Sequence, residues 1–338
     1  MRILYLPHSY SQQRQYEKPS NIYPVRMAME AEWYRKQGHN VIWPSWKHES
    51  LDTYLRWGKE DGYDKALIEP EWLPFLSLPH PDRIFTRAKE YTSGNYKYLP
   101  GTHILSAKGC WHGRCTFCVE QGIKYEIRQV ESVIEEIKEC KQLGFREVFD
   151  DSATFPIGGW LDEFCTRIKE IGIVFSCNFR IIDMDYRKLR ESNFRMLLVG
   201  VESANETTLD RIQKGIKVKD IIPFFKKASK AGLELHATAI IGFPWENYKD
   251  TMRTINLIKY LLIKGYANTA QMSFYVPPKG QELGNDEYRK YVTKFYEVGF
   301  NPLFWYNKII NIKSIEDLHY LIRGIQKGFN SLLKRRLT

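Results

Sequence analysis

The sequence has no apolar run long enough to cross a membrane. Of its 338 residues 43% are hydrophobic, but the most apolar stretches are short or interrupted by Lys and Asn. A membrane-spanning helix needs roughly 20 consecutive apolar residues, so we expect a protein with no membrane segment and no membrane partner. No secretory leader precedes the first strand-like segment, and we expect a cytoplasmic location.

Cysteine is scarce and unevenly placed. Three of the six cysteines lie within residues 110–118, and the other three are Cys140, Cys165 and Cys177. This spacing is not typical of a disulfide framework, so we expect a reducing compartment. Cys140 and Cys165 fall in helical patterns and are expected to be buried small apolar residues.

The positive charge is concentrated near the C-terminal end. The formal net charge is +10, and residues 286–338 hold ten Lys or Arg against five Asp or Glu. Such a surplus could attract nucleic acid or an acidic peptide, but it is more often typical of a solvated helical face. Both interpretations remain open from the sequence.

The N-terminal segment resembles the start of a Rossmann-like domain. Strand pattern 2–6, helix pattern 27–37 and strand pattern 41–43 form a β-α-β unit. Residues 44–105 are rich in Trp, Pro and Tyr, with too little helical periodicity for three further β-α units. Residues 1–100 therefore predict a truncated Rossmann-like segment of the cobalamin-domain type.

From His103 onward, strands alternate regularly with helices, which indicates parallel strands joined by right-handed crossovers. Six units are too few for a closed eight-stranded barrel. We therefore predict an α/β fold with a partial (β/α)6 TIM-type barrel over residues 101–285 and a basic helical extension over 286–338. The expected strands are 103–106, 147–149, 174–179, 196–201, 234–241 and 269–275, and the expected helices between them are 133–143, 161–171, 186–192, 221–231 and 248–263.

The most informative motif is the cysteine loop after the first of these strands. It reads Ala-Lys-Gly-Cys-Trp-His-Gly-Arg-Cys-Thr-Phe-Cys over residues 107–118. Three thiolates on one loop suit three corners of a 4Fe-4S cluster, which leaves the fourth iron open to another ligand. The alternative is structural zinc, for which His112 would have to complete a set of four ligands.

Polar residues lie where such a barrel places its active loops. Asp150, Arg180, Glu202 and Gly242 each fall at or just after the end of an expected strand. The carboxyl ends of parallel strands form one rim, so these residues are expected on the same rim as the cysteine loop.

These features together resemble the radical SAM enzymes over roughly residues 103–283. The resemblance rests on the cysteine loop with Phe117 before its last cysteine, on Gly200-Val201-Glu202-Ser203, Leu209, Lys214-Gly215 and Ile240-Ile241-Gly242-Phe243-Pro244, and on Pro277-Pro278-Lys279-Gly280. It is greatest for the subgroup with an N-terminal cobalamin-type domain. The family usually has three and then two residues between its cysteines, whereas here there are four and two.

The resemblance implies the cofactors and their ligands. Cys110, Cys115 and Cys118 would hold a 4Fe-4S cluster, and S-adenosylmethionine (SAM) would bind its open iron. Arg180 would pair with the SAM carboxylate, and Glu202 would bind the ribose hydroxyls unless it forms a structural ion pair. Ser203, which follows Glu202, would also belong to the cofactor-binding residues. Phe117, Ile240 and Gly242 would contact the adenine, and Asp150 or Asp151 would hold the SAM amino group or substrate unless they cap the following segment. Cys177 is a candidate hydrogen donor to a product radical.

The implied reaction is reductive cleavage of SAM to a 5′-deoxyadenosyl radical, which abstracts hydrogen from a substrate for modification, rearrangement or epimerisation. The electron would come from a reductant such as flavodoxin or ferredoxin, and the substrate would be a peptide, a nucleic acid or a small metabolite. The alternatives are a cobalamin-dependent methyltransferase and a nucleic-acid modifying enzyme. No cysteine follows Cys177 to build a second cluster, which argues against methylthiolation. No Asp-x-His-x-x-Gly loop is present either, which argues against cobalamin.

Overall fold

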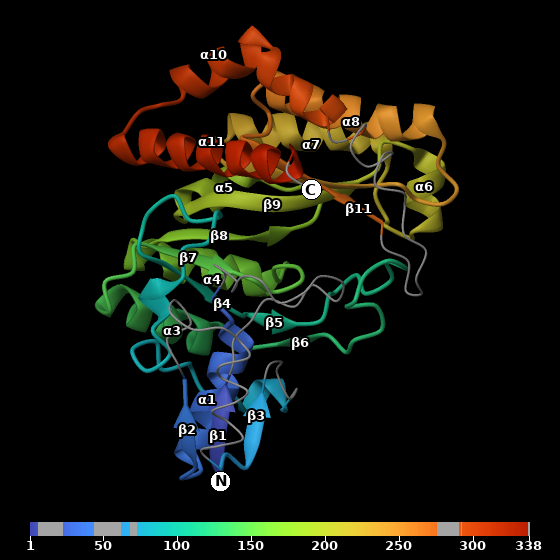
Figure 1. Ribbon diagram of the computed structural model, residues 1–338. Helices are drawn as coiled ribbons and strands as arrows, with labels where there is room; N and C mark the ends of the chain where they lie inside the picture. The colour runs from blue at the N-terminus through green and yellow to red at the C-terminus, as the bar shows by residue number, and fades with distance from the viewer. Residues whose placement is uncertain (6–22, 44–61, 68–72, 276–290, 292, 337–338) are drawn as a thin grey trace. The chain divides into compact units, whose positions relative to one another are not determined.

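The computed structural model describes residues 1–5, 23–43, 62–67, 73–275, 291 and 293–336 (Figure 1). The chain folds as two compact units. The first unit comprises residues 1–108 and 126–151, and the second comprises 109–125 and 152–338. The three-part division at residues 100 and 285 stays a prediction.

The first unit begins with a small parallel sheet. Its order is β2-β1-β3, with Ile3 paired to Val41 on one side and to Lys65 on the other. The elements are β1 (Arg2–Tyr5), α1 (Val25–Lys36), β2 (Asn40–Ile42) and β3 (Lys65–Leu67). The expected β-α-β start is therefore present, and β3 adds a strand that the pattern missed. The segments that follow the three strands, 6–22, 44–61 and 68–72, lie outside the described residues.

The rest of the first unit supplies two strands of the main sheet. Its elements are the 3-10 turns η1 (Phe75–Ser77) and η2 (Ala88–Glu90), the strands β4 (Gly101–Ile104), β5 (Ala107–Lys108), β6 (Glu126–Ile127) and β7 (Glu147–Asp150), and the helix α3 (Val130–Gln142). β5 pairs antiparallel with β6, so this short stem closes the base of the cysteine loop. The expected strand 103–106 is wrong by two residues, because Gly101 and Thr102 already pair with β7.

The main sheet has six strands in the order β11-β10-β9-β8-β7-β4. The pairs β4–β7, β8–β9, β9–β10 and β10–β11 are all parallel. Strands that follow one another along the chain are neighbours in the sheet, as in a barrel that stops before closure. The predicted fold class, a partial TIM-type barrel with a helical C-terminal region, is confirmed.

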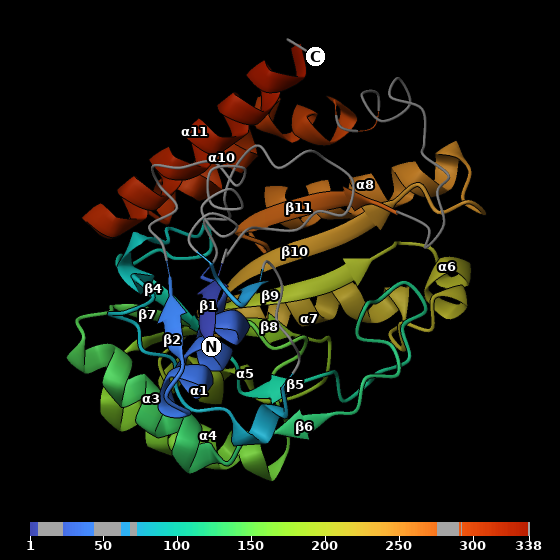
Figure 2. The ribbon, with the colours of Figure 1, turned by 60° about the horizontal axis from the view of Figure 1, so that its bottom comes forward.

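The second unit alternates strands and helices and then ends in helices. The elements are α4 (Gly159–Ile171), β8 (Val174–Phe179), α5 (Tyr186–Glu191), β9 (Phe194–Glu202), α6 (Glu206–Arg211), α7 (Val218–Lys230), β10 (Glu234–Ile241), α8 (Tyr248–Ile263), β11 (Thr269–Phe274), η3 (Glu297–Phe300), α10 (Pro302–Ile310) and α11 (Ile315–Arg336). Figure 2 shows α7 and α8 running along β9, β10 and β11. Among the described residues, no helix has the length and apolar character to span a bilayer.

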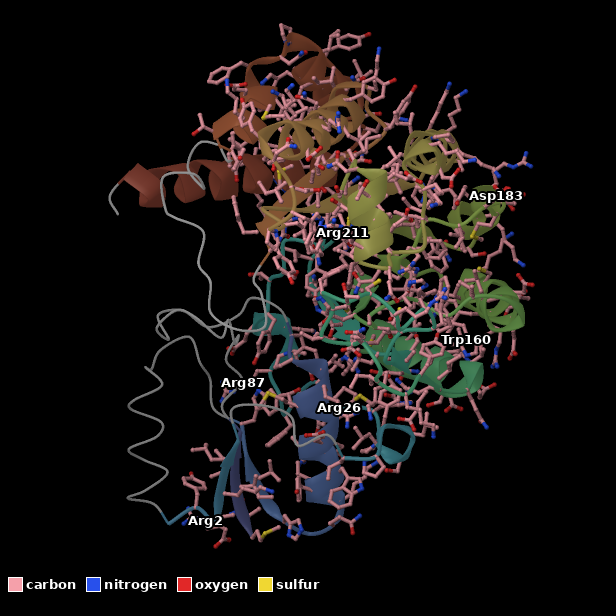
Figure 3. The ribbon with its side chains drawn as sticks, turned by 90° about the vertical axis from the view of Figure 1, so that its right-hand side faces the viewer. Arg2, Arg26, Arg87, Trp160, Asp183 and Arg211 are labelled. Carbon is pink, nitrogen blue, oxygen red and sulfur yellow. The ribbon has the colours of Figure 1, made fainter. Side chains whose placement is uncertain are left out.

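Local sequence sets the helix ends. α8 begins with a capping box, in which Asn247 accepts from the backbone of Asp250 and Asp250 accepts from the backbone of Asn247. α4 ends at Gly172, whose φ of 68° is left-handed and suits glycine. Under α4 lies an aromatic core in which Trp160, labelled in Figure 3, stacks on Phe164 with centroids 5.2 Å apart.

Strand β10 separates the two faces of the sheet. Its residues alternate strictly between buried and half-exposed, with Ala239 and Ile241 buried and Thr238 and Ile240 half-exposed. A strand presents alternate residues to opposite faces. The half-exposed set therefore faces away from the helix layer, on the side where a barrel of this kind has its interior.

Candidate functional site

The cysteine loop lies within residues 109–125 of the second unit. Gly109 has φ 73°, and a Cβ there would lie 2.9 Å from the carbonyl oxygen of Lys124, so the two arms of the loop can approach only at a glycine. Cys110, Cys115 and Cys118 form no disulfide; Cys115 is buried, and Cys110 and Cys118 are half-buried.

The three thiols share one electrostatic neighbourhood. Burial raises the pKa of the Cys118 thiol, and the nearby thiols of Cys115 and Cys110 raise it further. The backbone N–H of Glu120 lowers this pKa, since the group lies 3.5 Å from Cys118 Sγ. The Cys118 thiol is therefore harder to ionise than an exposed cysteine.

No three His, Cys, Asp or Glu side chains of the described residues converge closely enough to hold a single metal ion. Structural zinc needs four ligands around one point, and both the zinc alternative and the cluster stay predictions. Thiolates on different irons of a cluster diverge from its corners, so they need no such convergence. The donor set itself, three cysteines on one loop, is the kind that iron–sulfur clusters take.

The loop rests on the turn that joins α6 to α7, which we call the 212–215 turn. The Thr116 backbone N–H donates to the Ile212 carbonyl at 3.0 Å. His112 Nε2 donates to the Gln213 carbonyl at 2.7 Å, and Cys115 Sγ lies 3.8 Å from the same oxygen. His112 is thus bound to the protein backbone.

Arg180 lies between the cysteine loop and the 212–215 turn. Its guanidinium donates to the Lys214 carbonyl, and Nη1 is 3.9 Å from Cys115 Sγ. The same group lies 5.2 Å from the centroid of the Trp111 ring, within cation–π range. Arg180 follows β8 directly and is buried, so the structure brings this predicted site residue to the predicted cluster ligand.

Glu202 forms a buried ion pair with Lys214, with Oε1 and Nζ 2.6 Å apart. A Cβ on Gly200 would lie 2.1 Å from Glu202 Oε1 and 2.6 Å from Lys214 Nζ, so the pair fits only beneath a glycine. Lys214 Nζ also lies 5.9 Å from the centroid of Phe117. The structural ion pair that the sequence left open for Glu202 is present, and ribose binding stays a prediction.

Asp150 is used within the first unit. It is fully buried at the end of β7 and accepts from the Ser106 backbone N–H at 2.9 Å and from the Ser106 hydroxyl. Asp151 is exposed, and its backbone N–H donates to the Ile104 carbonyl at 2.9 Å. Asp150 thus links the end of β7 to the residues after β4, and its role toward SAM or substrate stays a prediction.

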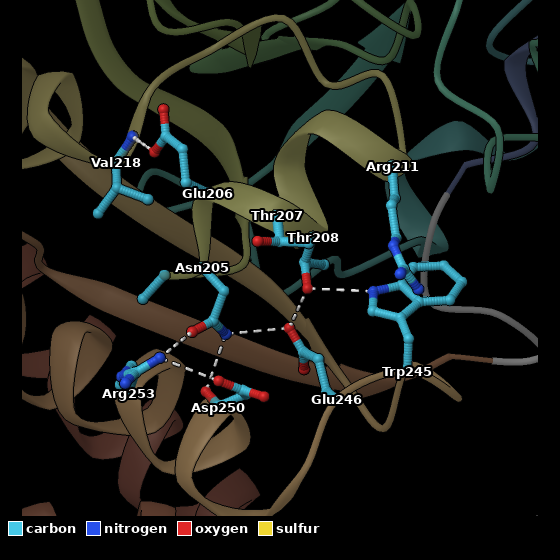
Figure 4. Close-up of a pocket in the computed structure, with 11 residues that line it drawn as sticks. Asn205, Glu206, Thr207, Thr208, Arg211, Val218, Trp245, Glu246, Asp250 and Arg253 are labelled. Atoms are coloured by element: carbon cyan, nitrogen blue, oxygen red, sulfur yellow. Dashed lines mark hydrogen bonds and ion pairs between the residues drawn. The ribbon is translucent and has the colours of Figure 1, made fainter.

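Ser203 belongs to a hydrogen-bond network centred on Glu246. Glu246 Oε1 accepts from Ser203 Oγ at 2.8 Å, from Asn205 Nδ2 at 3.0 Å and from Thr208 Oγ1 at 2.7 Å. Figure 4 shows part of this network beside a pocket of about 510 Å³. No residue that the sequence predicted for the site lines this pocket. The lining residues are Ala204, Asn205, Glu206, Thr207, Thr208, Arg211, Val218, Trp245, Glu246, Asp250 and Arg253.

The predicted adenine contacts lie on the half-exposed side of β10. Ile240 is half-exposed and pairs with Ser273 of β11. Gly242 follows β10 with φ 81°, a left-handed conformation that explains the glycine. Contact between these residues and an adenine ring stays a prediction.

Cys177 lies on the opposite, helix-covered face of the sheet. It is fully buried, and it follows Phe175 by two residues, so the two side chains share a face. Phe175 packs on Phe164 of α4 with centroids 5.1 Å apart. This placement puts the Cys177 side chain on the face that the helices cover, and its role as a hydrogen donor stays a prediction.

Sequence reasoning missed the central position of the 212–215 turn. His112 and Gln213 are 101 residues apart, and no local pattern indicates that they meet. The Lys214-Gly215 pair is part of the family resemblance, but nothing in the sequence indicates that Glu202 and Arg180 are its partners. Their contacts with Lys214 depend on tertiary packing that periodicity does not encode.

The part of the chain that holds these residues folds as an open parallel α/β barrel that carries a three-cysteine loop. Residues 104–258 match the model of the Radical SAM superfamily. This match covers the strands and helices from the end of β4 into α8, so this part of the chain is similar to a radical SAM domain.

Two curated relatives cover about half of this chain. An uncharacterized methyltransferase of Pyrococcus horikoshii is 29% identical over 196 residues, which are 55% of this chain and 41% of that protein. A putative methylthiotransferase of Methanocaldococcus jannaschii is 24% identical over 173 residues, 46% of this chain and 38% of that protein. The chain thus spans about two fifths of the length of these relatives.

A solved structure with a similar arrangement is the radical S-adenosylmethionine methyltransferase TsrM from Kitasatospora setae, with cobalamin and a [4Fe-4S] cluster bound. It aligns with a TM-score of 0.46 at 18% identity, over 51% of this chain and 34% of that one.

Proposed function

We propose that Cys110, Cys115 and Cys118 hold a [4Fe-4S] cluster and that the enzyme uses SAM to abstract a hydrogen atom from its substrate. When bound, the cluster and SAM supply one-electron reductive cleavage of the SAM sulfonium. The observation that carries the proposal is the position of Cys115, which is buried between the Arg180 guanidinium and the 212–215 turn.

In this proposal the second unit prepares a positive environment for an anionic cofactor. The Arg180 guanidinium lies beside Cys115, and its N–H groups that face away from the Lys214 carbonyl bind the SAM carboxylate in the planar manner that suits a guanidinium. Glu202, oriented by Lys214, accepts from the ribose hydroxyls through its second oxygen. Phe117, Ile240 and Gly242 enclose the adenine, and Ser203 keeps the end of β9 in place through Glu246.

The source of the electron and the substrate are further parts of the proposal. A reductant such as flavodoxin or ferredoxin supplies the electron. A peptide, a nucleic acid or a small metabolite is compatible with the described residues. The first assay is therefore best performed without substrate, with SAM cleavage as its readout.

The experiment compares Cys115→Ala with Cys165→Ala, a matched control because Cys165 is buried in α4. After anaerobic reconstitution, the control should retain iron and sulfide, show a broad iron–sulfur absorbance and cleave SAM with dithionite. Cys115→Ala should lose iron and cleavage, because the cluster loses one of three ligands. Unchanged iron in Cys115→Ala, or stoichiometric zinc in the wild type, would contradict the proposal.

A second candidate is a cobalamin-dependent methyltransferase. The parallel β2-β1-β3 sheet supports it, because cofactors of open α/β sheets bind beyond the carboxyl ends of their strands. Those segments, which include His8 and His48, lie outside the described residues. Cobalt analysis after reconstitution with hydroxocobalamin decides this candidate: stoichiometric cobalt favours it, and iron without cobalt removes it.

A further inference from the structure

Three consecutive main-chain carbonyls of the 212–215 turn accept hydrogen bonds from the cysteine loop and from Arg180. The Ile212 and Gln213 carbonyls accept from Thr116 and His112 of the loop, and the Lys214 carbonyl accepts from Arg180. Main-chain acceptors keep their position when side chains rotate. The turn therefore offers the loop a rigid docking surface.

The turn holds this surface in a strained conformation. Gln213 has φ 52°, a left-handed value that is uncommon for a residue with a Cβ. Residues in such conformations persist only where the surrounding structure determines them. The left-handed Gln213 is the residue whose carbonyl receives both His112 Nε2 and the Cys115 thiol.

The His112 ring also packs directly on Gly215. A Cβ at Gly215 would lie 2.6 Å from His112 Cε1, and Gly215 has φ 72°. A carbonyl oxygen is an acceptor only, so the His112 nitrogen that faces Gln213 carries the hydrogen. That nitrogen has no lone pair left for a metal.

We infer that His112 is a positioning residue, which docks the cysteine loop on the 212–215 turn and thereby sets the place of Cys110 and Cys115 on either side of it. The inference rests on the proposed function, because it concerns the cluster that these cysteines hold. Residues that orient metal ligands typically change metal affinity by about 10–100-fold when removed. His112 acts in this way without touching the cluster.

The experiment measures how fast a chelator removes iron from anaerobically reconstituted holoenzyme. His112→Ala should lose iron about 10-fold faster than the wild type or more, whereas His112→Gln keeps an N–H donor at a similar distance and should restore most of the retention. The electron paramagnetic resonance signal of the reduced cluster, with and without SAM, should keep its wild-type form in His112→Gln. The melting temperature of each cluster-free variant reports folding separately.

A double-mutant cycle tests whether His112 works through the turn. Gly215→Ala should speed iron loss in the wild-type background, because its new Cβ meets the His112 ring. The same substitution should have a smaller effect in His112→Ala, where only the backbone strain of a residue with a Cβ at φ 72° remains. Equal, additive effects in the two backgrounds would overturn the inference, and this readout stays decisive even where His112→Ala lowers the melting temperature.

The remaining outcomes separate this inference from the proposed function. A wild-type protein that takes up no iron contradicts the proposed function and the inference with it. If the wild type holds iron and His112→Ala loses it no faster, the inference about His112 is wrong while the proposed function stands. Loss of iron in both His112→Ala and His112→Gln, with an altered resonance signal, would make His112 a ligand and also overturn it.

Discussion

Each unit of the molecule contains a buried ionic cluster built from two cations and one glutamate, and the two clusters differ in what they leave available. In the first unit Glu136 accepts from Arg83 at 2.6 Å and from Arg128 at 2.5 Å, so both of its oxygens are paired. In the second unit Glu202 pairs with Lys214, and the second cation, Arg180, is directed to a carbonyl and a thiol.

The partners of the charged groups distinguish a buried ion cluster that only stabilises the fold from one that belongs to a functional site. Arg83 also donates from Nε to the Thr102 hydroxyl and from Nη2 to the His103 carbonyl, so both partners beyond Glu136 belong to the fold itself. In the second cluster a guanidinium faces a cysteine, and the Glu202 carboxylate meets Lys214 through one of its two oxygens. A cation directed at a soft donor is the feature that marks a site, because the fold alone gains little from it.

The largest effect on stability is expected from removing the negative charge of Glu136, which pairs with Arg83 and Arg128. Glu136→Gln should lower the free energy of unfolding by about 3–5 kcal/mol, because it leaves two buried guanidinium groups without a counter-charge. Chemical denaturation checks this value. The control is Glu139→Gln on the same helix, whose half-exposed partner is His80; it should cost less than about 1 kcal/mol. Equal losses would mean that the burial of the cluster is unimportant.

The same cluster predicts an acid sensitivity with a defined sign. Burial raises the pKa of Glu136, but the charges of Arg128 and Arg83 outweigh it and lower the pKa from 4.5 to about 2. Because the pKa of Glu136 is lower in the folded state than in the unfolded state, its carboxylate stabilises the folded protein at pH values above the unfolded-state pKa. This stability is lost as the pH falls from about 4.5 toward 2. The amount is on the order of 3 kcal/mol. The difference in unfolding free energy between wild type and Glu136→Gln should therefore shrink across this window, and a constant difference would refute the assignment.

A smaller effect is expected from crowding the second cluster. Gly200→Ala places a Cβ against the Glu202–Lys214 pair and should cost about 1–3 kcal/mol, since the ends of both side chains must move. Gly159→Ala is a matched control, because no atom of the described residues lies within 4 Å of its Cβ position at the start of α4. That control should be neutral or slightly stabilising. Chemical denaturation of the two variants measures this difference. If neither substitution changed the free energy of unfolding, the prediction would be wrong.

Much of the fold could be predicted because its elements are long and periodic. The helices near 161–171 and 248–263 and the strand 234–241 agree with α4, α8 and β10 within two residues at each end. The elements β3, β5, β6 and α6 were missed, since two to six residues are too few to show a period. The expected strand 103–106 does not include Gly101 and Thr102, which extend β4 through their pairing with β7, a tertiary contact that local sequence does not encode.

The candidate site was predicted less completely, for a physical reason. The types and order of residues indicated a cysteine loop, Arg180 and Glu202, since these follow strand ends. The partners that fix them, Gln213 and Lys214, come from a turn whose contacts span 12 to 101 residues. The orientation of Cys177 depended on which face of β8 the helices cover, which a buried strand does not reveal by its pattern.

The chain crosses between its two compact units three times, after residues 108, 125 and 151. No single cut can therefore yield both units as continuous fragments. A fragment that starts at residue 152 lacks the cysteine loop that belongs to its unit, and one that ends at 151 carries that loop without the turn on which it rests. Recombinant work on this enzyme is best planned around the undivided polypeptide. A proteolytic nick within the loop should leave the two pieces associated, because the first unit is built from chain on both sides of it.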